Sequence, residues 1–239
     1  MKVKNWVACT LSIACAMAAS SAAAAPDDKP ADAGKGSAFK SAVFEMKQKG
    51  QVAVLLPCAA GKEVTVTTNG DKETDVHLFV HDADKNEVGK DTSPGPKCEV
   101  KVTPKTEGTY KLLVKNKGPG PNNITLAVKV ADADDEPADA GKGSAFNGTV
   151  FELHDKGDVA LLRTFAADKE VTVTTNGDKE TDVHLFIHDA DKNEVGKDTS
   201  PGPKCEVKFT PKSEGTYRLL VKNQGPGPNN VTLTVKVAE

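Results

Sequence analysis

Residues 62–82 read KEVTVTTNGDKETDVHLFVHD, two alternating segments on either side of a polar turn. In the second segment, Val76, Leu78 and Val80 alternate with His77 and Phe79. A side-chain period of two places alternate residues on opposite faces of a β-strand, with one face buried and the other wetter. The stretch therefore predicts two half-buried strands.

This stretch lies in a segment that the chain contains twice. Every residue of 62–110 has a counterpart 107 positions later, in 169–217. The two segments differ at only three pairs of positions: Val80/Ile187, Val102/Phe209 and Thr106/Ser213. The units of solenoid proteins are about 20–50 residues long, whereas a whole domain commonly has about 100–150. The chain is therefore expected to hold two tandem copies of one domain.

Further alternating runs surround this stretch in each copy. In the first copy they start near Cys98, Tyr110 and Ile124, and two less regular runs precede them at 42–46 and 51–56. No stretch after residue 25 shows a sustained helical period. About eight strands at roughly ten-residue spacing favour an all-β fold of two tandem antiparallel β-sandwiches, jelly-roll-like, each closing its own apolar interior.

The remaining segments divide the chain. The first 25 residues combine a basic start, a short apolar run and an alanine-rich end, which is the pattern of a signal peptide. Two other segments are rich in Ala, Asp, Pro, Gly and Lys and can bury little, so we expect a flexible leader and a linker there. The predicted boundaries are signal peptide 1–25, leader 26–38, first repeat 39–130, linker 131–145 and second repeat 146–239.

The charge of the chain argues against a nucleic-acid partner. The whole chain has a net charge of −3. Removing the signal peptide, with Lys2 and Lys4, leaves 29 basic and 34 acidic side chains, a net charge of −5. A mildly acidic surface lacks the basic footprint of nucleic-acid-binding proteins. No apolar run after the signal peptide reaches the length of a membrane span. We expect a secreted or periplasmic protein.

Three cysteines follow the signal peptide, an odd number for an oxidising compartment: Cys58, Cys98 and Cys205. Phe165 is the counterpart of Cys58 in the second copy, so Cys205 has no partner within its own copy. One interpretation is a disulfide between Cys58 and Cys98. The other, which we favour, is that Cys98 and Cys205 are buried thiols that pack as small apolar side chains.

Three motifs of the first copy recur in a known family. Residues 75–86 form an Asp-rich alternating strand with an Asp/Asn turn, residues 107–114 hold a Gly-Thr-Tyr strand, and residues 60–66 read AGKEVTV. Together they resemble the bacterial pre-peptidase C-terminal (PPC) domain, and the resemblance covers most of each copy. Lys85 and Lys192 stand where that family usually has glycine. The resemblance implies a non-catalytic module of the kind that accompanies secreted peptidases and other exported proteins.

The outward side of the strand in residues 75–82 carries the candidate binding residues. His77, Phe79 and His81 share this side, and an outward aromatic side chain is unusual. His77 and His81 are about 13 Å apart at ~3.3 Å per residue, which is too far for both to bind one metal ion. We predict a binding face from these residues and their copies: His77, Phe79, His81, His184, Phe186 and His188.

The turn after this strand begins like a calcium loop. Asp82, Asp84 and Asn86 place oxygen donors at alternate positions. Glu87 and Ser93, however, occupy the places where an EF-hand loop needs glycine and glutamate. An incidental calcium site and plain turn stabilisation both stay open. Calcium is the one cofactor that the sequence suggests, and its candidate ligands are Asp82, Asp84, Asp91, Asp189, Asp191 and Asp198.

The sequence holds no nucleophile elbow and no Cys–His pair with an orienting third group. We therefore predict a non-enzymatic exported protein that binds an extracellular or cell-envelope ligand. One alternative is a calcium-stabilised structural spacer. Another is a glycan-binding module or an accessory to a secreted hydrolase. The glycan alternative lacks the tryptophan platform common in sugar sites, because the one tryptophan, Trp6, lies in the signal peptide.

Overall fold

The computed structural model describes residues 40–131 and 147–238. Every regular element in these two ranges is a β-strand, sixteen in all, and neighbouring strands run antiparallel. The predicted all-β class is confirmed. The predicted signal peptide and leader, and the predicted linker beyond Ala131, lie outside the described residues. Across the described ranges, no helix is long and apolar enough to cross a membrane.

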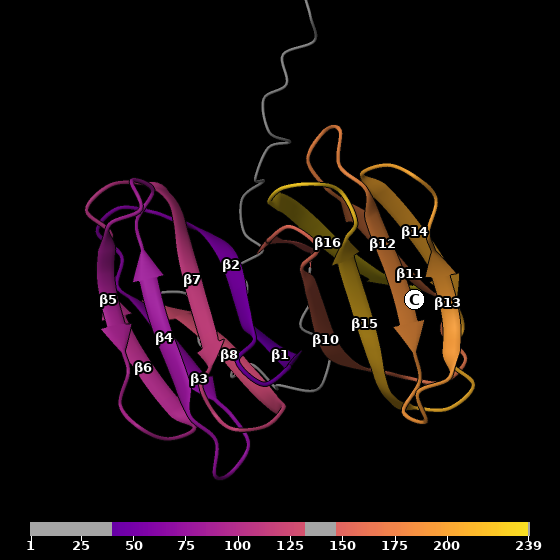
Figure 1. The fold of residues 1–239 in the computed structure, drawn as a ribbon, viewed down its shortest axis with the longest axis horizontal. Helices are drawn as coiled ribbons and strands as arrows, with labels where there is room; N and C mark the ends of the chain where they lie inside the picture. The colour runs from indigo at the N-terminus through magenta and orange to yellow at the C-terminus, as the bar shows by residue number, and fades with distance from the viewer. Residues whose placement is uncertain (1–39, 132–146, 239) are drawn as a thin grey trace, which may run out of the picture. The chain divides into compact units, whose positions relative to one another are not determined.

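Each repeat contributes eight strands (Figure 1). Those of the first repeat are β1 (Ser41–Met46), β2 (Gln51–Cys58), β3 (Val64–Asn69), β4 (Val76–His81), β5 (Glu87–Asp91), β6 (Lys97–Val102), β7 (Gly108–Asn116) and β8 (Asn122–Val130). Those of the second repeat are β9 (Asn147–Leu153), β10 (Asp158–Phe165), β11 (Val171–Asn176), β12 (Val183–His188), β13 (Glu194–Asp198), β14 (Lys204–Phe209), β15 (Gly215–Asn223) and β16 (Asn229–Val237).

The strands of each repeat are divided between two sheets. In the first repeat the order is β1-β8-β3-β6 in one sheet and β2-β7-β4-β5 in the other. The second repeat has the same order, β9-β16-β11-β14 and β10-β15-β12-β13. Most consecutive strands, such as β1 and β2, therefore lie in different sheets, which is the double Greek key of a jelly roll. The predicted jelly roll is confirmed.

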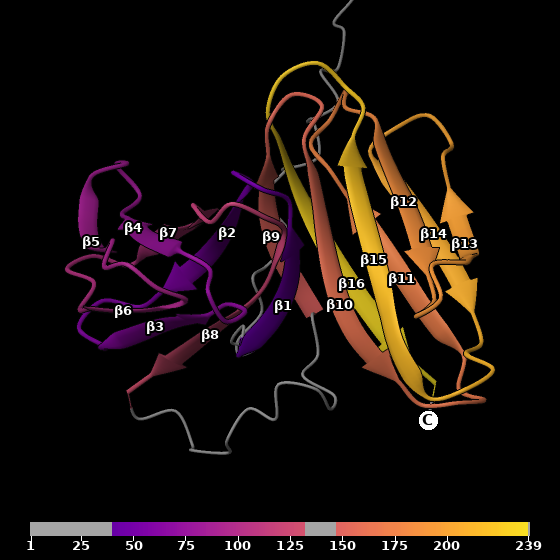
Figure 2. The ribbon, with the colours of Figure 1, turned by 60° about the horizontal axis from the view of Figure 1, so that its bottom comes forward.

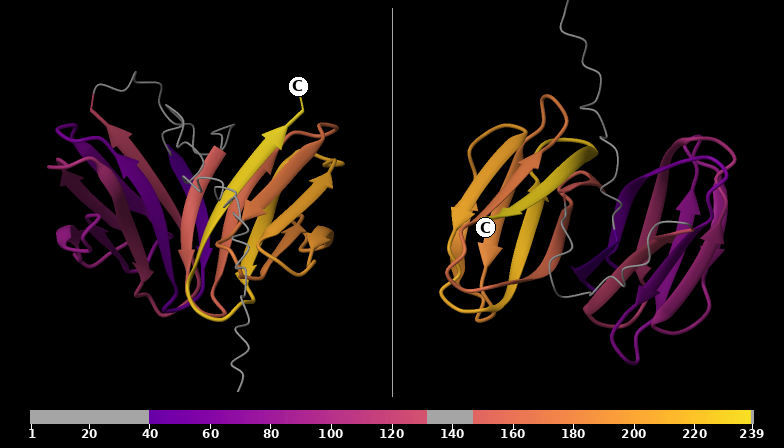
Figure 3. Two further views of the ribbon diagram at one scale, coloured as in Figure 1. Left: turned by 90° about the horizontal axis from the view of Figure 1, so that it is seen from above. Right: turned by 180° about the vertical axis from the view of Figure 1, so that it is seen from behind.

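The two repeats share these sheets. β1 pairs with β10 and β2 pairs with β9, so each sheet runs through eight strands, four from each repeat (Figure 2). As a result β4 belongs to one sheet and its counterpart β12 to the other. Figure 3 shows the strands of both repeats from two further sides. We call the paired β1/β10 and β2/β9 edges the junction.

Alternation along the strands buries one continuous apolar core. Buried residues of both repeats belong to a single hydrophobic cluster. At the junction, the fully buried rings of Phe44 and Phe151 meet edge to face with centroids 6.0 Å apart. The expectation that each copy closes its own interior is therefore wrong, because the apolar inner edges of the two repeats bury against each other.

The turn between β4 and β5 has the geometry that its residues predict. The backbone N–H of Asp82 donates to the carbonyl of Asn86 at 2.9 Å, and that of Lys85 donates to the carbonyl of Asp82 at 3.0 Å. Lys85 and Lys192 both have φ 67°, in the left-handed region that favours glycine. The position thus keeps a backbone shape suited to glycine although lysine occupies it.

Candidate functional site

The outer side of β4, β5 and β7 forms the candidate site, which we call the β4 face. Alternate residues of β4 point into the core and are fully buried. His77, Phe79 and His81 are half-buried on the outer side. The structure therefore brings the three candidate residues of this strand onto one surface.

Strand β7 adds lysines to this surface. Its outer residues lie opposite those of β4 in the pairs His77/Lys115, Phe79/Leu113 and His81/Lys111. The Lys115 ammonium lies 4.9 Å from the centroid of the Phe79 ring, which is a cation–π contact. The His77 ring lies 6.3 Å from the same ring. The Phe79 ring is thus in contact with both a cation and an imidazole.

The second repeat has the same arrangement on the outer side of β12, β13 and β15, which we call the β12 face. Lys222 lies 5.0 Å from the centroid of the Phe186 ring, and the His184 ring lies 6.2 Å from it. The cross-strand pairs are His184/Lys222, Phe186/Leu220 and His188/Arg218. The chain therefore presents two nearly identical faces.

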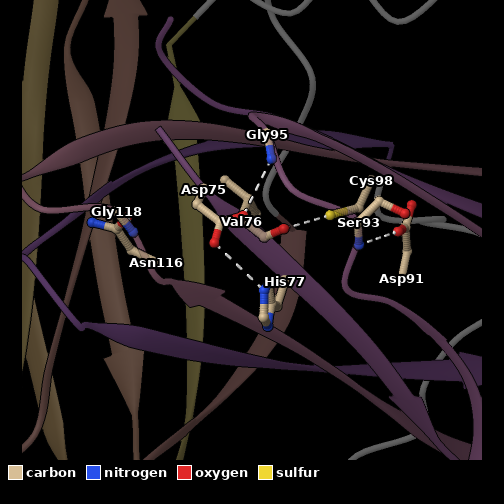
Figure 4. Close-up of polar contacts among 9 residues, drawn as sticks. All are labelled: Asp75, Val76, His77, Asp91, Ser93, Gly95, Cys98, Asn116 and Gly118. Atoms are coloured by element: carbon tan, nitrogen blue, oxygen red, sulfur yellow. Dashed lines mark hydrogen bonds and ion pairs between the residues drawn. The ribbon is translucent and has the colours of Figure 1, made fainter. Parts of the chain in front are cut away.

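An acidic residue stands at the end of each face. Asp75 Oδ2 lies 3.6 Å from His77 Nε2, an ion pair when the imidazole is protonated (Figure 4). The backbone N–H of Gly95 donates to Asp75 Oδ1 at 3.2 Å and fixes this carboxylate. In the second repeat, Asp182 and His184 are also 3.6 Å apart. The carboxylates orient the first histidine of each face.

The last histidine of each face has a buried ring nitrogen. Nδ1 of His81 and Nδ1 of His188 are buried, and neither has a hydrogen-bond partner within the described ranges. A buried polar atom without a partner costs free energy, so such atoms are rare in native proteins. Each face thus has one buried imidazole nitrogen without a protein partner in the described ranges.

The calcium candidates are engaged in their own turns. The backbone N–H of Asn86 donates to Asp82 Oδ1 at 2.8 Å, and its side-chain amide donates to Oδ2 at 3.1 Å. These bonds, the side-chain bond first, lower the pKa of Asp82. Asp189 makes the same two bonds with Asn193. Asp84 and Asp191 are exposed in the turns.

Asp91 likewise accepts backbone bonds, from Ser93 at 3.0 Å and from Glu99 at 2.9 Å, and these lower its pKa. Asp198 makes the equivalent bonds to Ser200 and Glu206. Nowhere in residues 40–131 and 147–238 does a group of three or more His, Cys, Asp or Glu side chains stand ready to hold a metal ion. A calcium site stays a prediction, and the contacts observed are those of turn caps.

The three cysteines are free and buried. Cys98 Sγ donates to the Val76 carbonyl at 2.8 Å, and Cys205 Sγ donates to the Val183 carbonyl at the same distance. The disulfide between Cys58 and Cys98 is not formed in this structure. Burial raises the pKa of the Cys58 thiol to about 11, so this thiol is neutral and unreactive at physiological pH.

Sequence reasoning missed the lysines of the two faces. The alternation of Lys111, Leu113 and Lys115 shows that they share one side of a strand. It does not show that β7 is the neighbour of β4, which the jelly-roll order decides. Lys115 and Lys222 therefore enter the site through sheet topology rather than through a local motif.

No protein-family model matches the chain, and no curated protein matches it significantly. Membership of the PPC family stays a prediction.

Several solved structures are similar at low identity. An anti-sigma factor domain-containing protein from Clostridium clariflavum is 10% identical, with 84% of this chain and 87% of that chain covered and a TM-score of 0.27. The PBSX exported protein XepA is 11% identical, with 83% and 85% covered and a TM-score of 0.30. The N-terminal CBM22-1–CBM22-2 tandem domain of a Paenibacillus barcinonensis protein is 9% identical, with 75% and 82% covered and a TM-score of 0.25. Scores this low support no conclusion about function.

Proposed function

We propose that the protein is a non-catalytic, exported binding protein that uses the β4 face and the β12 face as two equivalent sites for an extracellular or cell-envelope ligand. One observation carries this proposal. The same half-buried phenylalanine lies under a lysine and beside a histidine in both repeats, with lysine–ring distances of 4.9 and 5.0 Å. Core packing alone does not require an outward aromatic residue at both positions.

The chemistry of the faces favours a ligand that offers negative charge beside an apolar group. Lys115 brings a cation to the β4 face of a chain whose net charge is −3, while Lys111 beside it is paired with Glu152. Phe79 and Leu113 offer half-buried apolar contact. A neutral sugar ring that stacks on a bare aromatic platform is a poorer match, because Lys115 covers the Phe79 ring.

The experiment is co-sedimentation of the protein with the native cell-envelope fraction, compared with the double variant Phe79→Ala/Phe186→Ala. We expect the bound fraction to fall at least about tenfold, since a buried aromatic anchor commonly contributes 2 kcal/mol or more to binding. Binding should also weaken at high salt, because the lysine contribution is screened.

The matched control is Thr67→Ala/Thr174→Ala. These equivalent threonines are half-buried on the outer sides of β3 and β11, away from the two faces. The control should bind like the wild type, and circular dichroism should show that both variants are folded. If the phenylalanine variant binds as well as the control, or if the wild type does not bind, the proposed function is wrong.

A further inference from the structure

The contacts across the junction are the same from both sides. Phe44 of β1 lies opposite Leu161 of β10, and 107 positions away Phe151 of β9 lies opposite Val54 of β2. The other residue pairs correspond in the same way: Val43/Leu162 with Val150/Leu55, and Glu45/Ala160 with Glu152/Ala53. Phe44 and Phe151 are counterparts that touch each other. This is the pattern of a two-fold, isologous interface, in which one patch pairs with its own copy.

The ion pairs of the junction follow the same rule. Lys111 Nζ lies 2.8 Å from Glu152, and its counterpart Arg218 lies 2.9 Å from Glu45. The junction therefore holds two equivalent ion pairs. In each pair the cation lies on β7 or β15 and the acid lies on β9 or β1 of the other repeat. These side chains are between 24% and 41% exposed, so water only partly screens the attraction.

A second pair of contacts differs between the two sides. Lys47 Nζ lies 2.9 Å from Asp158, whereas the equivalent positions hold His154 and Gln51, whose side-chain nitrogens are 2.6 Å apart. The first repeat thus supplies Lys and Gln at these positions, and the second supplies His and Asp. At these two positions, only the second repeat carries both a basic side chain, His154, and an acidic one, Asp158.

Buried asparagines fix the turns that carry these residues. Asn116 Nδ2 donates to the Lys47 carbonyl at 3.0 Å, and Asn223 Nδ2 donates to the His154 carbonyl at 3.0 Å. Both asparagines are buried. Each repeat therefore holds its own junction residues in place through contacts within that repeat.

The other sheet edges of each repeat are built differently. β5 has only five residues, a bulge opposite its start and an exposed ion pair between Glu87 and Lys90. β6 alternates buried residues with exposed Lys97, Glu99 and Lys101. Short, charged and bulged edges resist pairing with another chain. The inner edges bury apolar side chains such as Phe44 and Val54, and their charged residues, Glu45 and Glu152, are paired across the junction.

We infer that the inner edges of each repeat, β1 with β2 in the first and β9 with β10 in the second, form a self-recognition surface. Its partner is a second copy of the repeated domain, in the same chain or in another. The junction is a homodimer interface contained within one chain. Two second repeats would pair through two Glu152–Arg218 and two His154–Asp158 contacts. Two first repeats would keep the Glu45–Lys111 contacts but place Lys47 beside Gln51.

The test uses the full chain with a protease site inserted between residues 132 and 146. After cleavage of the folded protein, size-exclusion chromatography at micromolar concentration should show the two halves eluting together. After partial unfolding in urea and dilution, native mass spectrometry should detect pairs of two second halves and pairs of two first halves beside the original pair. At a pH low enough to protonate His154, pairs of second halves should exceed pairs of first halves by about 2- to 30-fold, because two weak His154–Asp158 ion pairs then favour them. Halves that elute apart, or that re-form the original pair alone, would overturn the inference.

A charge-reversal cycle on the cleaved chain adds a control. Glu45→Lys should weaken the association of the halves about 3- to 10-fold, and Arg218→Glu in the same chain should restore it. Glu87→Lys, at the outer edge, should leave the association unchanged. If Glu45→Lys has no larger effect than Glu87→Lys, or if Arg218→Glu gives no rescue, the junction is not the recognition surface. The envelope-binding test of the two faces does not depend on this result.

Discussion

At the scale of single residues, the two repeats differ within the shared core at Cys58, whose counterpart in the second repeat is Phe165. Cys58 is 6% exposed, and burial raises its pKa from an ordinary value near 9 to about 11. A thiol whose pKa is higher in the folded state than in the unfolded state favours folding at lower pH. Its contribution is complete below pH 9 and is lost as the pH rises towards 11.

Alkaline stability tests this account. Between pH 8 and pH 10.5 the unfolded thiol ionises while the folded one stays neutral, which should cost the wild type about 1–2 kcal/mol of unfolding free energy. Cys58→Ala is less stable at pH 8 but should lose less over this interval. Urea unfolding at both pH values gives the two differences, and equal losses would contradict the assignment. Cys98 and Cys205, whose pKa values burial also raises, account for a remaining decline in both proteins.

At the scale of secondary-structure elements, the glycine of β5 lets this edge strand lie close to the core. A Cβ atom on Gly89 would lie 2.6 Å from a methyl carbon of Val100, and one on Gly196 would lie 2.5 Å from Val207. Neither glycine has a positive φ, so these positions require glycine for lack of space and not because of the backbone conformation.

Substitution of these glycines should therefore detach the edge strand. Gly89→Ala or Gly196→Ala is expected to destabilise the protein by about 1–3 kcal/mol through overpacking. Gly215→Ala in β15 is the control, since a Cβ atom there meets nothing within 4 Å. Thermal or urea unfolding compares the three variants, and a neutral Gly89→Ala would show that β5 can move away at little cost.

The sequence predicts most strands because alternation is a local property. The regular alternation of buried and more exposed residues along β4 and β6 follows directly from their sequences. β5 does not show the alternation because, as an edge strand, it exposes residues on both of its sides. The alternation also does not predict the lysine over Phe79 or the pairing of β1 with β10, because contacts between residues distant in the chain leave no periodic signal in the sequence.

The candidate site was predictable to the same extent. The side of β4 that carries His77, Phe79 and His81 follows from the period of two. The turn chemistry of Asp82 with Asn86 was one of the two interpretations of the Asp-rich turn, and it is the contact observed. Buried His81 Nδ1 could not be anticipated, because burial of a single ring atom depends on the neighbouring strands.

At the scale of the whole molecule, the shared sheets and single core predict that the repeats unfold together. Differential scanning calorimetry should show one transition whose calorimetric and van't Hoff enthalpies agree. Two well-separated transitions in the wild type would contradict the shared core.

Two double variants distinguish the contribution of the junction to cooperative unfolding from the contribution of core packing elsewhere. Phe44→Leu/Phe151→Leu weakens the contact between the repeats, whereas Leu78→Val/Leu185→Val weakens each repeat away from it. Both pairs should lower Tm by roughly 2–8 °C. The transition should broaden or split in the junction pair and stay single in the core pair.

The division of β4 and β12 between different sheets has a consequence for what the molecule can hold. The outer sides of two packed sheets do not form one surface, so a ligand on the first phenylalanine leaves the second free for another molecule. Under the proposed binding role, a chain built in this way would act as a cross-linker that tethers two polymer strands or two particles, rather than as a bivalent binder of one flat target.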